Sequence, residues 1–468
     1  MFRIKPKILP SFKEAMILTI IILCTIGISI IYFESVPHIP IVISILILIA
    51  YGLKKGLTFK ELEYGMGEGA KAAIGSVFLF FFIGILVSSW IISGTIPALM
   101  QVGLAMVTPK CYFAIIFLIS SLIGLGIGSS LTTSATIGTA FMGISAALGF
   151  SLPMTAGAVI SGAFFGDKMS PLSDTTNLAA SMARVDLFEH IKNMGWTTIP
   201  AFIITLLLFV VLSPTGQQLD AQQLYDFNVA LSDTGMIFWY SFIPLVVMII
   251  LSVKKMPALI TLATSSIVAI TVSFFHFKNQ SISALFNILY GGYVSQTGNS
   301  MIDVLLTRGG IESMMFTVSL VLLALSMGGL LFTLGIIPKF LIQMENMLTN
   351  RGSLITVTAL TGIMVNFLTG EQYLSILITG EMYQSQFEKL GLNGKYLSRV
   401  LEDAGTVVNP LVPWGVCGVF LTNVLGVSTI QYLPFAFFCI LCPILTIIYG
   451  WTGWTITQKK EDKKITNV

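Results

Sequence analysis

The stretch Gly162-Ala-Phe-Phe-Gly-Asp-Lys-Met-Ser-Pro-Leu-Ser-Asp-Thr-Thr-Asn-Leu-Ala-Ala-Ser181 places charged and hydroxyl side chains within a chain that is 55% hydrophobic. Gly166 and Pro171 flank the charged pair Asp167 and Lys168, and both residue types are typical of a break in a helix. Charged groups at membrane depth are costly and are usually functional. The stretch therefore predicts a broken helix that carries a polar site.

The rest of the chain has the composition of a helical membrane protein. Only 10% of its 468 residues are charged, and its mean hydropathy is +0.90. Apolar runs cover residues 15–33, 72–92, 112–130, 257–276, 314–335 and 432–455. At about 1.5 Å per helical residue, each run spans or nearly spans the roughly 30 Å of bilayer hydrocarbon. The runs are continuous rather than alternating, so we predict an all-α polytopic fold of about 12 to 14 membrane elements, with no soluble domain.

Several other classes of protein are disfavoured. The five cysteines lie in or beside apolar segments and the three histidines lie near the ends of runs, which favours packing over metal or redox chemistry. No phosphate-binding loop of the Gly-x-x-x-x-Gly-Lys type is present. The basic start of the chain precedes an apolar run without a small-residue cleavage site, which indicates a retained first helix. We expect no enzyme activity, no cofactor and no binding of nucleic acid.

An internal repeat relates the two halves of the chain at a spacing of 226 to 241 residues. Four pairs of short motifs occur in the same order: Tyr64-Gly65 with Tyr290-Gly291, Gly94-x-Ile96-Pro97 with Gly335-x-Ile337-Pro338, Leu131-Thr132 with Leu368-Thr369, and Pro171-Leu172 with Pro410-Leu411. Each pair alone is weak, but their common order predicts two structurally related halves.

Basic residues predict opposite orientations for these halves, because cytoplasmic loops are enriched in Lys and Arg. In the first half, Lys54 and Lys55 place the loop after the second apolar run in the cytoplasm, and segment 34–38 before that run lies outside. In the second half, Lys254 and Lys255 lie in the loop equivalent to segment 34–38, which places that loop in the cytoplasm. The predicted organisation is a cytoplasmic tail (1–14), a first inverted transmembrane repeat (15–213), an extracytoplasmic connector (214–237), a second inverted repeat (238–456) and a second cytoplasmic tail (457–468).

Matched breaks in the two halves are expected to meet near the middle of the membrane, as in transporters built from inverted repeats. The segment 123–134 is rich in Gly and hydroxyl residues, and 366–371 is its counterpart. Residues 166–171 and 405–413 break their helices at matched places. Pro171, Pro410 and Pro413 are the prolines we assign to these breaks.

The residues at these breaks form a candidate site for sodium and protons. Hard oxygen donors suit sodium, and a desolvated carboxylate can hold a proton instead, so both ions can compete for one group. The candidate ion- or proton-binding residues are Asp167, Ser170, Ser173, Asp174, Thr175, Asn177, Glu402, Asp403, Thr406 and Asn409, with sodium assigned to Asp167, Asp174 and Asn409. The candidate contacts for a larger substrate are Lys168, Thr132, Thr133, Asn366, Glu371 and Arg399.

Ordinary structural roles compete with these assignments. An intramembrane carboxylate can pair with a nearby cation, here Lys168 or Arg399, and hold the helices together. For Glu371 and Glu381, a structural role or a position in a loop has the same weight as a role in the site. Lys168 itself has three interpretations: a surrogate for the transported cation, a contact to an anion, or a salt-bridge partner.

The run 162–179 closely resembles the signature of the NhaC sodium/proton antiporter family, and Glu402-Asp-Ala-Gly-Thr-Val-Val-Asn-Pro-Leu-Val-Pro-Trp-Gly-Val416 resembles the second-half signature of that family. The resemblance runs essentially the whole length of the chain. It implies a multi-pass secondary carrier of the bacterial cytoplasmic membrane, with inverted repeats and re-entrant hairpins. We predict an ion-driven elevator or rocking movement of one bundle against the other. The chain shows no departure within either motif.

The resemblance leaves the substrate open, because the family also contains exchangers of proton-coupled malate for sodium-coupled lactate. Sodium/proton exchange is the favoured prediction, and malate-proton/sodium-lactate exchange is the alternative. A passive channel or a membrane enzyme is a third class, but the chain lacks a continuous polar stripe and a nucleophile with its base. The expected partners are the lipid bilayer, Na⁺ and H⁺, with malate and lactate under the alternative. Related folds are often homodimers, although the sequence identifies no dimer face.

Overall fold

The structure is a computed structural model that describes residues 5–33, 35–106, 111–214, 228–276, 281–345 and 350–456. Across these residues it is helical, and its only β-pairing is an isolated bridge between Tyr293 and Arg308. Within these ranges, six helices are long and apolar enough to cross a membrane, or up to eight if each of two bent helix pairs counts as one span. The chain is therefore an all-α, multi-pass membrane protein, as predicted. The number of 12 to 14 membrane elements stays a prediction.

The six long helices agree with the apolar runs only in part. They are α1 (Phe12–Ile31), α4 (Ile74–Ile92), α11 (Leu187–Leu212), α14 (Ala258–His276), α17 (Gly310–Thr333) and α19 (Arg351–Thr369). The run 112–130 forms the shorter helix α6 (Tyr112–Ile127). The set of apolar runs omitted α11 and α19, because charged residues interrupt the first turns of α11 and Thr and Gly interrupt α19.

One predicted run contains a bend. Residues 432–455 belong to two helical pieces, α23 with η6 (Thr429–Phe435) and α24 (Phe437–Thr452), bent by 60° to each other. Pro434 lies in the short 3₁₀ segment before the bend. Because proline lacks an amide donor, the α-helical ladder does not continue through this segment.

The two halves repeat the same order of helices. In the first half α1, α2 (His38–Lys54) and α3 (Phe59–Ala72) precede α4 and α5 (Thr95–Met106). In the second half α13 (Ile243–Val253), α14 and α15 (Ile282–Gly291) precede α17 and α18 (Ile336–Glu345), with the short α16 (Ser300–Leu306) added. The second helix of each half packs against the long helix of the other, since α2 contacts α17 and α14 contacts α4. This exchange of partners joins the two halves in one body.

Gly128 and Gly370 mark the equivalent breaks of the repeat. Gly128 ends α6 at φ +70° and is followed by α7 (Ser130–Thr133), η2 (Ser134–Gly138) and α8 (Thr139–Ala147). Gly370 ends α19 at φ +73° and is followed by α20 (Gln372–Lys389). The alignment of Leu131-Thr132 with Leu368-Thr369 was therefore wrong, because the first pair follows its glycine and the second precedes it. The glycines were the better markers, since the left-handed conformation favours glycine.

The proline-containing breaks also occur where the sequence predicted them. Helix α9 (Leu152–Met169) ends at Ser170, and α10 (Asp174–Met182) begins four residues later. In the second half α21 (Gly394–Val400) continues into the π-helical η4 (Leu401–Thr406) and the short η5 (Asn409–Leu411). The next helix, α22 (Val416–Leu425), is bent by 45° from that segment.

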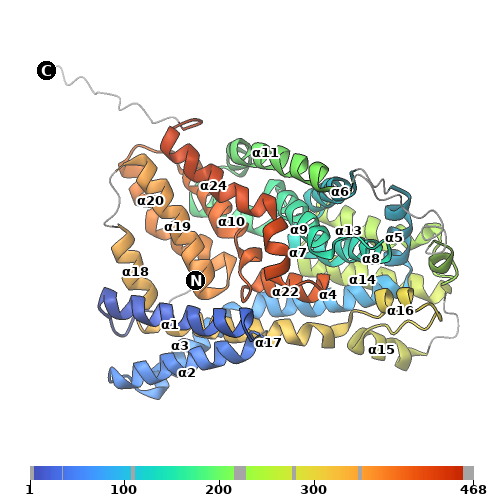
Figure 1. Cartoon of the computed structure of the whole chain (residues 1–468), viewed down its shortest axis with the longest axis horizontal. Helices are drawn as coiled ribbons and strands as arrows, with labels where there is room; N and C mark the ends of the chain where they lie inside the picture. The colour runs from blue at the N-terminus through green and yellow to red at the C-terminus, as the bar shows by residue number, and fades with distance from the viewer. Residues whose placement is uncertain are drawn as a thin grey trace.

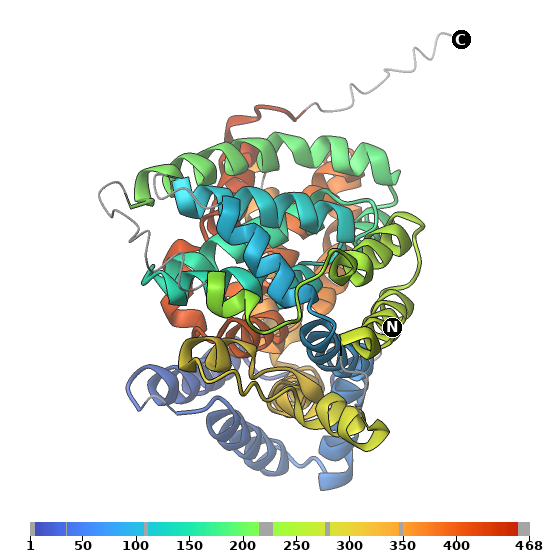
Figure 2. The same ribbon diagram turned by 90° about the vertical axis from the view of Figure 1, so that its right-hand side faces the viewer.

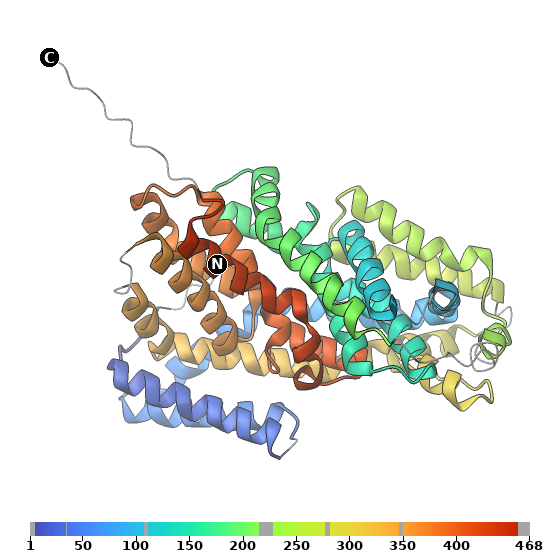
Figure 3. The ribbon, with the colours of Figure 1, turned by 45° about the horizontal axis from the view of Figure 1, so that its top comes forward.

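The helices form two layers that meet along α4 and α17. Helices α1–α3 lie along one edge of the molecule against α17, at the bottom of Figures 1 and 2. Helices α11 and α24 run side by side on the other side (Figure 3). Buried aliphatic and aromatic side chains of α4, α6, α9 and α22 form the largest core cluster. The broken helices therefore end inside the molecule, between the two layers.

Candidate functional site

Two adjoining cavities lie where the broken helices end. The first, here named the ion cavity, has a volume of about 470 Å³. Its wall includes Gly128, Ser129, Ser130, Thr132, Asp167, Pro171, Ser173, Asp174, Thr175, Asn177, Ser252, Lys255, Gln372 and Tyr373. The second, here named the side cavity, has a volume of about 620 Å³. Its wall includes Glu68, Lys71, Leu79, Leu131, Asp174, Glu371, Gln372, Tyr373, Leu374 and Leu377.

Three of the four predicted irregular segments reach these cavities. The break after α6, the break after α9 and the start of α20 all supply lining residues. The fourth segment, 405–413, does not line either cavity, although Val416 just after it lines the side cavity. The two cavities share Leu131, Asp174, Gln372 and Tyr373, so they lie next to each other.

Asp167 is fixed to the start of α7. The main-chain N–H of Ser130 donates to Asp167 Oδ2 at 3.1 Å, and the Ser130 hydroxyl donates to the same oxygen at 2.7 Å. A helix N-terminus favours a negative charge, because its first N–H groups have no partner within the helix. Asp167 is only 6% exposed, and it lines the ion cavity. Its carboxylate is therefore held in place at the wall of that cavity.

The residues of the α9–α10 break have different surroundings. Ser173 caps α10, since its hydroxyl accepts from the N–H of Thr176, and the Asn177 amide donates to the carbonyls of Pro171 and Ser173. Ser170 accepts from the N–H of Leu172. Asp174, the first residue of α10, is exposed to both cavities and has neither a hydrogen bond nor an ion pair in the described part of the chain. Among these residues, Asp174 is the carboxylate most accessible to an incoming cation.

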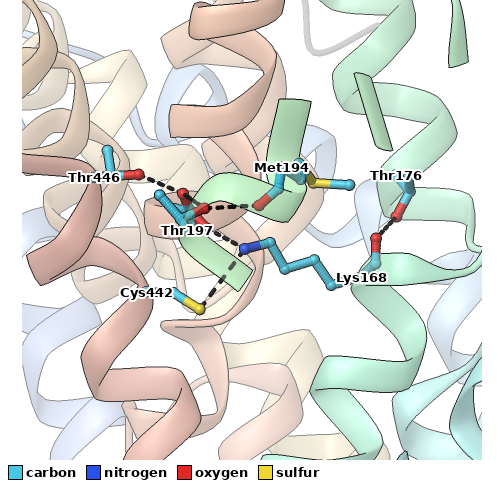
Figure 4. A network of polar contacts seen from close by, with 7 residues as sticks. Lys168, Thr176, Met194, Thr197, Cys442 and Thr446 are labelled. Atoms are coloured by element: carbon cyan, nitrogen blue, oxygen red, sulfur yellow. Dashed lines mark hydrogen bonds and ion pairs between the residues drawn. The ribbon is translucent and has the colours of Figure 1, made fainter. Parts of the chain in front are cut away.

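Lys168 and Asp403 form a fully buried ion pair between the two halves (Figure 4). Asp403 also accepts from the hydroxyl of Thr197 on α11, at 2.8 Å, and from that of Thr446 on α24. Lys168 Nζ lies 3.7 Å from Cys442 Sγ. These contacts satisfy both charges, so the salt-bridge interpretation of Lys168 describes the observed geometry. Lys168 lines neither of these two cavities.

Glu402, next to Asp403 in η4, has a contrasting environment. It is fully buried, and neither of its carboxyl oxygens has a hydrogen-bond partner among the described residues. The buried hydroxyl of Thr406, four residues later, interacts with the Glu402 carboxyl group but lies outside hydrogen-bond geometry. Glu402 lies within electrostatic reach of Asp167 and Lys168. Because an isolated buried carboxylate is very unfavourable, Glu402 is expected to hold either a proton or a bound cation.

Asn409 and Asn366 form an amide network within the second half. Asn409 Nδ2 donates to Asn366 Oδ1 at 2.9 Å and to the Gly370 carbonyl at 3.1 Å, and Asn409 Oδ1 accepts from the N–H of Cys417 at 2.8 Å. Asn366 Nδ2 donates to the Gly405 carbonyl at 2.6 Å. The amides thus join the two breaks of this half. Neither asparagine lines the ion cavity or the side cavity, so Asn409 does not share a cavity wall there with Asp167 and Asp174.

The remaining predicted substrate contacts are separated from one another. Thr132 lines the ion cavity, whereas Thr133 donates to the Ser129 carbonyl and does not. Glu371 caps α20 and lines the side cavity. Arg399 is buried away from both cavities, where it donates to Thr455 and lies over the rings of Tyr396 and Tyr449. Only Thr132 and Glu371 of this set are therefore accessible from the cavities.

Sequence reasoning missed several residues of the site. Ser130 holds Asp167, Thr197 and Thr446 hold Asp403, and Gln372 and Tyr373 line both cavities. Ser130 follows the glycine of a predicted break, so its position was a usable signal. Thr197 and Thr446 lie within ordinary apolar helices, so the sequence around them does not indicate that their hydroxyls contact Asp403.

The donors of the site suit a hard cation. No cluster of three or more His, Cys, Asp or Glu side chains with metal-binding spacing occurs in the described residues. Carboxylates, hydroxyls and carbonyls instead gather at the ends of broken helices, where alkali cations are commonly bound in transporters. Each half also contains one π-helical segment beside its break, η2 and η4, and such segments are frequent at functional sites.

The family model and the curated relatives described here are all named as antiporters. The family model described as "Na+/H+ antiporter family" matches residues 162–454. The chain is 40% identical to the Na(+)/H(+) antiporter NhaC of Alkalihalophilus pseudofirmus, over 91% of this chain and 92% of that protein. It is 34% identical to the arginine/ornithine antiporter ArcD of Halobacterium salinarum, over 98% and 95% of the two chains. It is 30% identical to the malate-2H(+)/Na(+)-lactate antiporter of Bacillus subtilis, over 97% of each.

Proposed function

The chain belongs to the Na⁺/H⁺ antiporter family, and from this premise we propose that it exchanges sodium ions for protons across the bacterial cytoplasmic membrane. The observation that carries the proposal is the pair of carboxylates at the ion cavity, Asp167 fixed to α7 and Asp174 unpaired. Both are negative groups at the end of a broken helix, which is the arrangement that attracts and binds a small cation in a secondary transporter.

Competition at these carboxylates supplies the exchange. A carboxylate that is out of bulk water binds either a sodium ion or a proton, because leaving it charged and unpaired is costly. A site that faces one side with sodium and the other side with protons therefore couples the two movements. The buried Glu402 and Thr406, within electrostatic reach of Asp167, extend this cation- and proton-binding region behind the cavity.

Access to the site is expected from the cytoplasmic side in this conformation. The ion cavity is bordered by Ser252 in the last turn of α13 and by Lys255 and Met256 in the α13–α14 loop. The lysines of that loop predict a cytoplasmic position. The cavities lie between α3, α4 and α14 on one side and the ends of α7, α10 and α20 on the other. A rocking or elevator movement of these two bodies, driven by the ion gradients, closes this access and opens the other. We place both termini in the cytoplasm.

A carboxylate-coupled exchange is the second candidate. A cavity of about 470 Å³ is larger than a single sodium ion requires, and the malate-lactate relative shows that one member of the family is named for organic cargo. Lys255 and Thr132 are the groups of the cavity wall that suit a carboxylate. Under this alternative, sodium and protons move only together with the organic acids.

The decisive experiment uses purified protein in liposomes with a pH reporter inside. Sodium is added outside, alone or together with malate and lactate, and with arginine and ornithine in a further arm. Proton efflux or uptake with sodium alone supports the sodium/proton antiporter. Movement only in the presence of an organic acid or amino acid contradicts it and identifies the required co-substrate.

A further inference from the structure

The side cavity has a wall chemistry that sodium binding does not explain. Most of its wall is apolar, with Leu79, Leu131, Leu374 and Leu377 among the lining residues. Its volume of about 620 Å³ lies in the range of sites for small organic molecules. A bare sodium ion gains nothing from such walls, so they point to a ligand with an apolar part.

The charges of the side cavity favour a cationic ligand. Glu68 and Lys71 form an ion pair with each other at the mouth. Two carboxylates remain, Glu371 and Asp174, and no cation in the described part of the cavity wall pairs with either. Glu371 is only 3% exposed, and one of its oxygens, Oε2, accepts from the N–H of Leu374. This cap satisfies part of the helix N-terminus and so offsets its attraction for anions.

Gln372 provides an independent indication of a missing donor. Its side chain is 94% buried, since it is 6% exposed, and it lines both cavities. Its Oε1 has no hydrogen-bond donor among the described residues. An unsatisfied buried acceptor is costly, and a ligand with N–H groups relieves that cost. The acceptors at this end of the cavity therefore outnumber the donors.

We propose that the side cavity binds an organic ammonium ion, with its charged head between Glu371, Gln372 and Asp174 and its alkyl chain along Leu377 and the other leucines. An ammonium group has three N–H donors and no acceptor, which complements carboxylate and amide oxygens. The alkyl chain buries apolar surface against the wall. Because Asp174 also lines the ion cavity, the ammonium ion competes with sodium for access to that carboxylate.

Binding is measured by titration calorimetry on protein in nanodiscs of phosphatidylcholine and phosphatidylglycerol, which contain no primary amine. The probes are methylammonium and n-hexylammonium, and affinity is expected to rise with chain length by up to about fourfold per methylene group. A high sodium concentration is expected to lower the affinity for both probes. Equal affinity for the two probes would overturn the apolar part of the site, and binding indifferent to sodium would overturn the shared role of Asp174.

Three variants locate the site. Glu371→Gln is expected to weaken both probes by about tenfold, because it removes a charged hydrogen-bond acceptor. Leu377→Gln is expected to weaken n-hexylammonium only and to leave sodium-driven proton flux unchanged. Glu381→Gln, on the exposed side of α20, is the matched control and should change nothing. Unchanged binding in Glu371→Gln would place the amine elsewhere.

The inference rests on the proposed function only through Asp174. The experiments can therefore contradict the amine site and the sodium/proton exchange independently of each other. The calorimetry requires no ion flux, so absent amine binding contradicts the side-cavity site while proton flux in liposomes remains intact. Absent flux together with chain-length-dependent amine binding contradicts the sodium/proton exchange and leaves the amine site standing.

Discussion

At the scale of single residues, the site separates two kinds of acidic side chain. Asp403 is surrounded by Lys168, Thr197 and Thr446, and every charge is matched. Asp174 is unpaired at the cavity, and Glu402 is buried without a donor. A satisfied carboxylate holds helices together, whereas an unsatisfied one has capacity for a cation or a proton.

The first prediction concerns the cavity carboxylates. Asp167→Asn and Asp174→Asn are each expected to abolish sodium-driven proton flux in liposomes, because an amide neither carries a proton nor balances a sodium charge. Insertion and monodispersity should be unchanged, since asparagine keeps the shape of each side chain. Glu381→Gln is the control and should keep full flux. Retained sodium-dependent flux in either aspartate variant would remove that residue from the ion site.

The second prediction concerns the buried ion pair. Lys168→Met alone is expected to lower the free energy of unfolding by about 3–5 kcal/mol, because Asp403 is left as an uncompensated buried charge. The double variant Lys168→Met with Asp403→Leu should recover most of that loss, since neither charge remains. The free energy of unfolding is measured, by heat or denaturant, for Lys168→Met, for Asp403→Leu and for the double variant. Additive losses would show that the two charges do not stabilise each other.

At the scale of helices, the breaks depend on backbone conformation as well as on side chains. Gly128 adopts φ +70° at the end of α6, and a Cβ atom there would lie 2.7 Å from Leu172 Cβ. Gly426 ends α22 at the same φ but has open space around it. These two glycines differ in their neighbours and not in their conformation, so they form a matched pair.

The third prediction uses this pair. Gly426→Ala is expected to cost about 1–2 kcal/mol from the left-handed conformation alone. Gly128→Ala should cost more, because Leu172 must also move, and it should reduce sodium-driven flux by displacing Ser130 from Asp167. Unfolding and flux are measured for both variants. If Gly128→Ala and Gly426→Ala lose the same stability and keep the same flux, the contact between Gly128 and Leu172 has no functional role.

At the scale of the whole molecule, the halves have the same order of helices, and α2 and α14 each pack against the long helix of the other half. Related halves with opposite orientations present equivalent breaks to a common centre from the two sides of the membrane. The proposed ion site nevertheless uses the halves unequally. The first half supplies Asp167 and Asp174 to the cavity, whereas the corresponding segment of the second half is closed by Asn366 and Asn409.

The fourth prediction tests the orientation of the halves. Single cysteines replace Ser35, Lys55 and Lys254 in a variant without the native cysteines, and an impermeant thiol reagent is applied to cells and to inverted vesicles. Lys55→Cys and Lys254→Cys should react only in inverted vesicles, and Ser35→Cys only in intact cells. Reaction of Lys254→Cys from outside would contradict the inverted repeat, because it would give the second half the orientation of the first.

The sequence alone determined the membrane class, most of the long helices and the places where helices break, because these depend on local composition, glycine and proline. It also gave the charged residues from which the site is built. Only the tertiary structure decided which of them are satisfied: Lys168 and Asp403 are 235 residues apart, and Ser130 and Asp167 are 37 apart. The pairing of buried charges and the walls of a cavity depend on segments that come together only on folding, so neighbouring acids such as Glu402 and Asp403 differ in their environments although they are adjacent in the sequence.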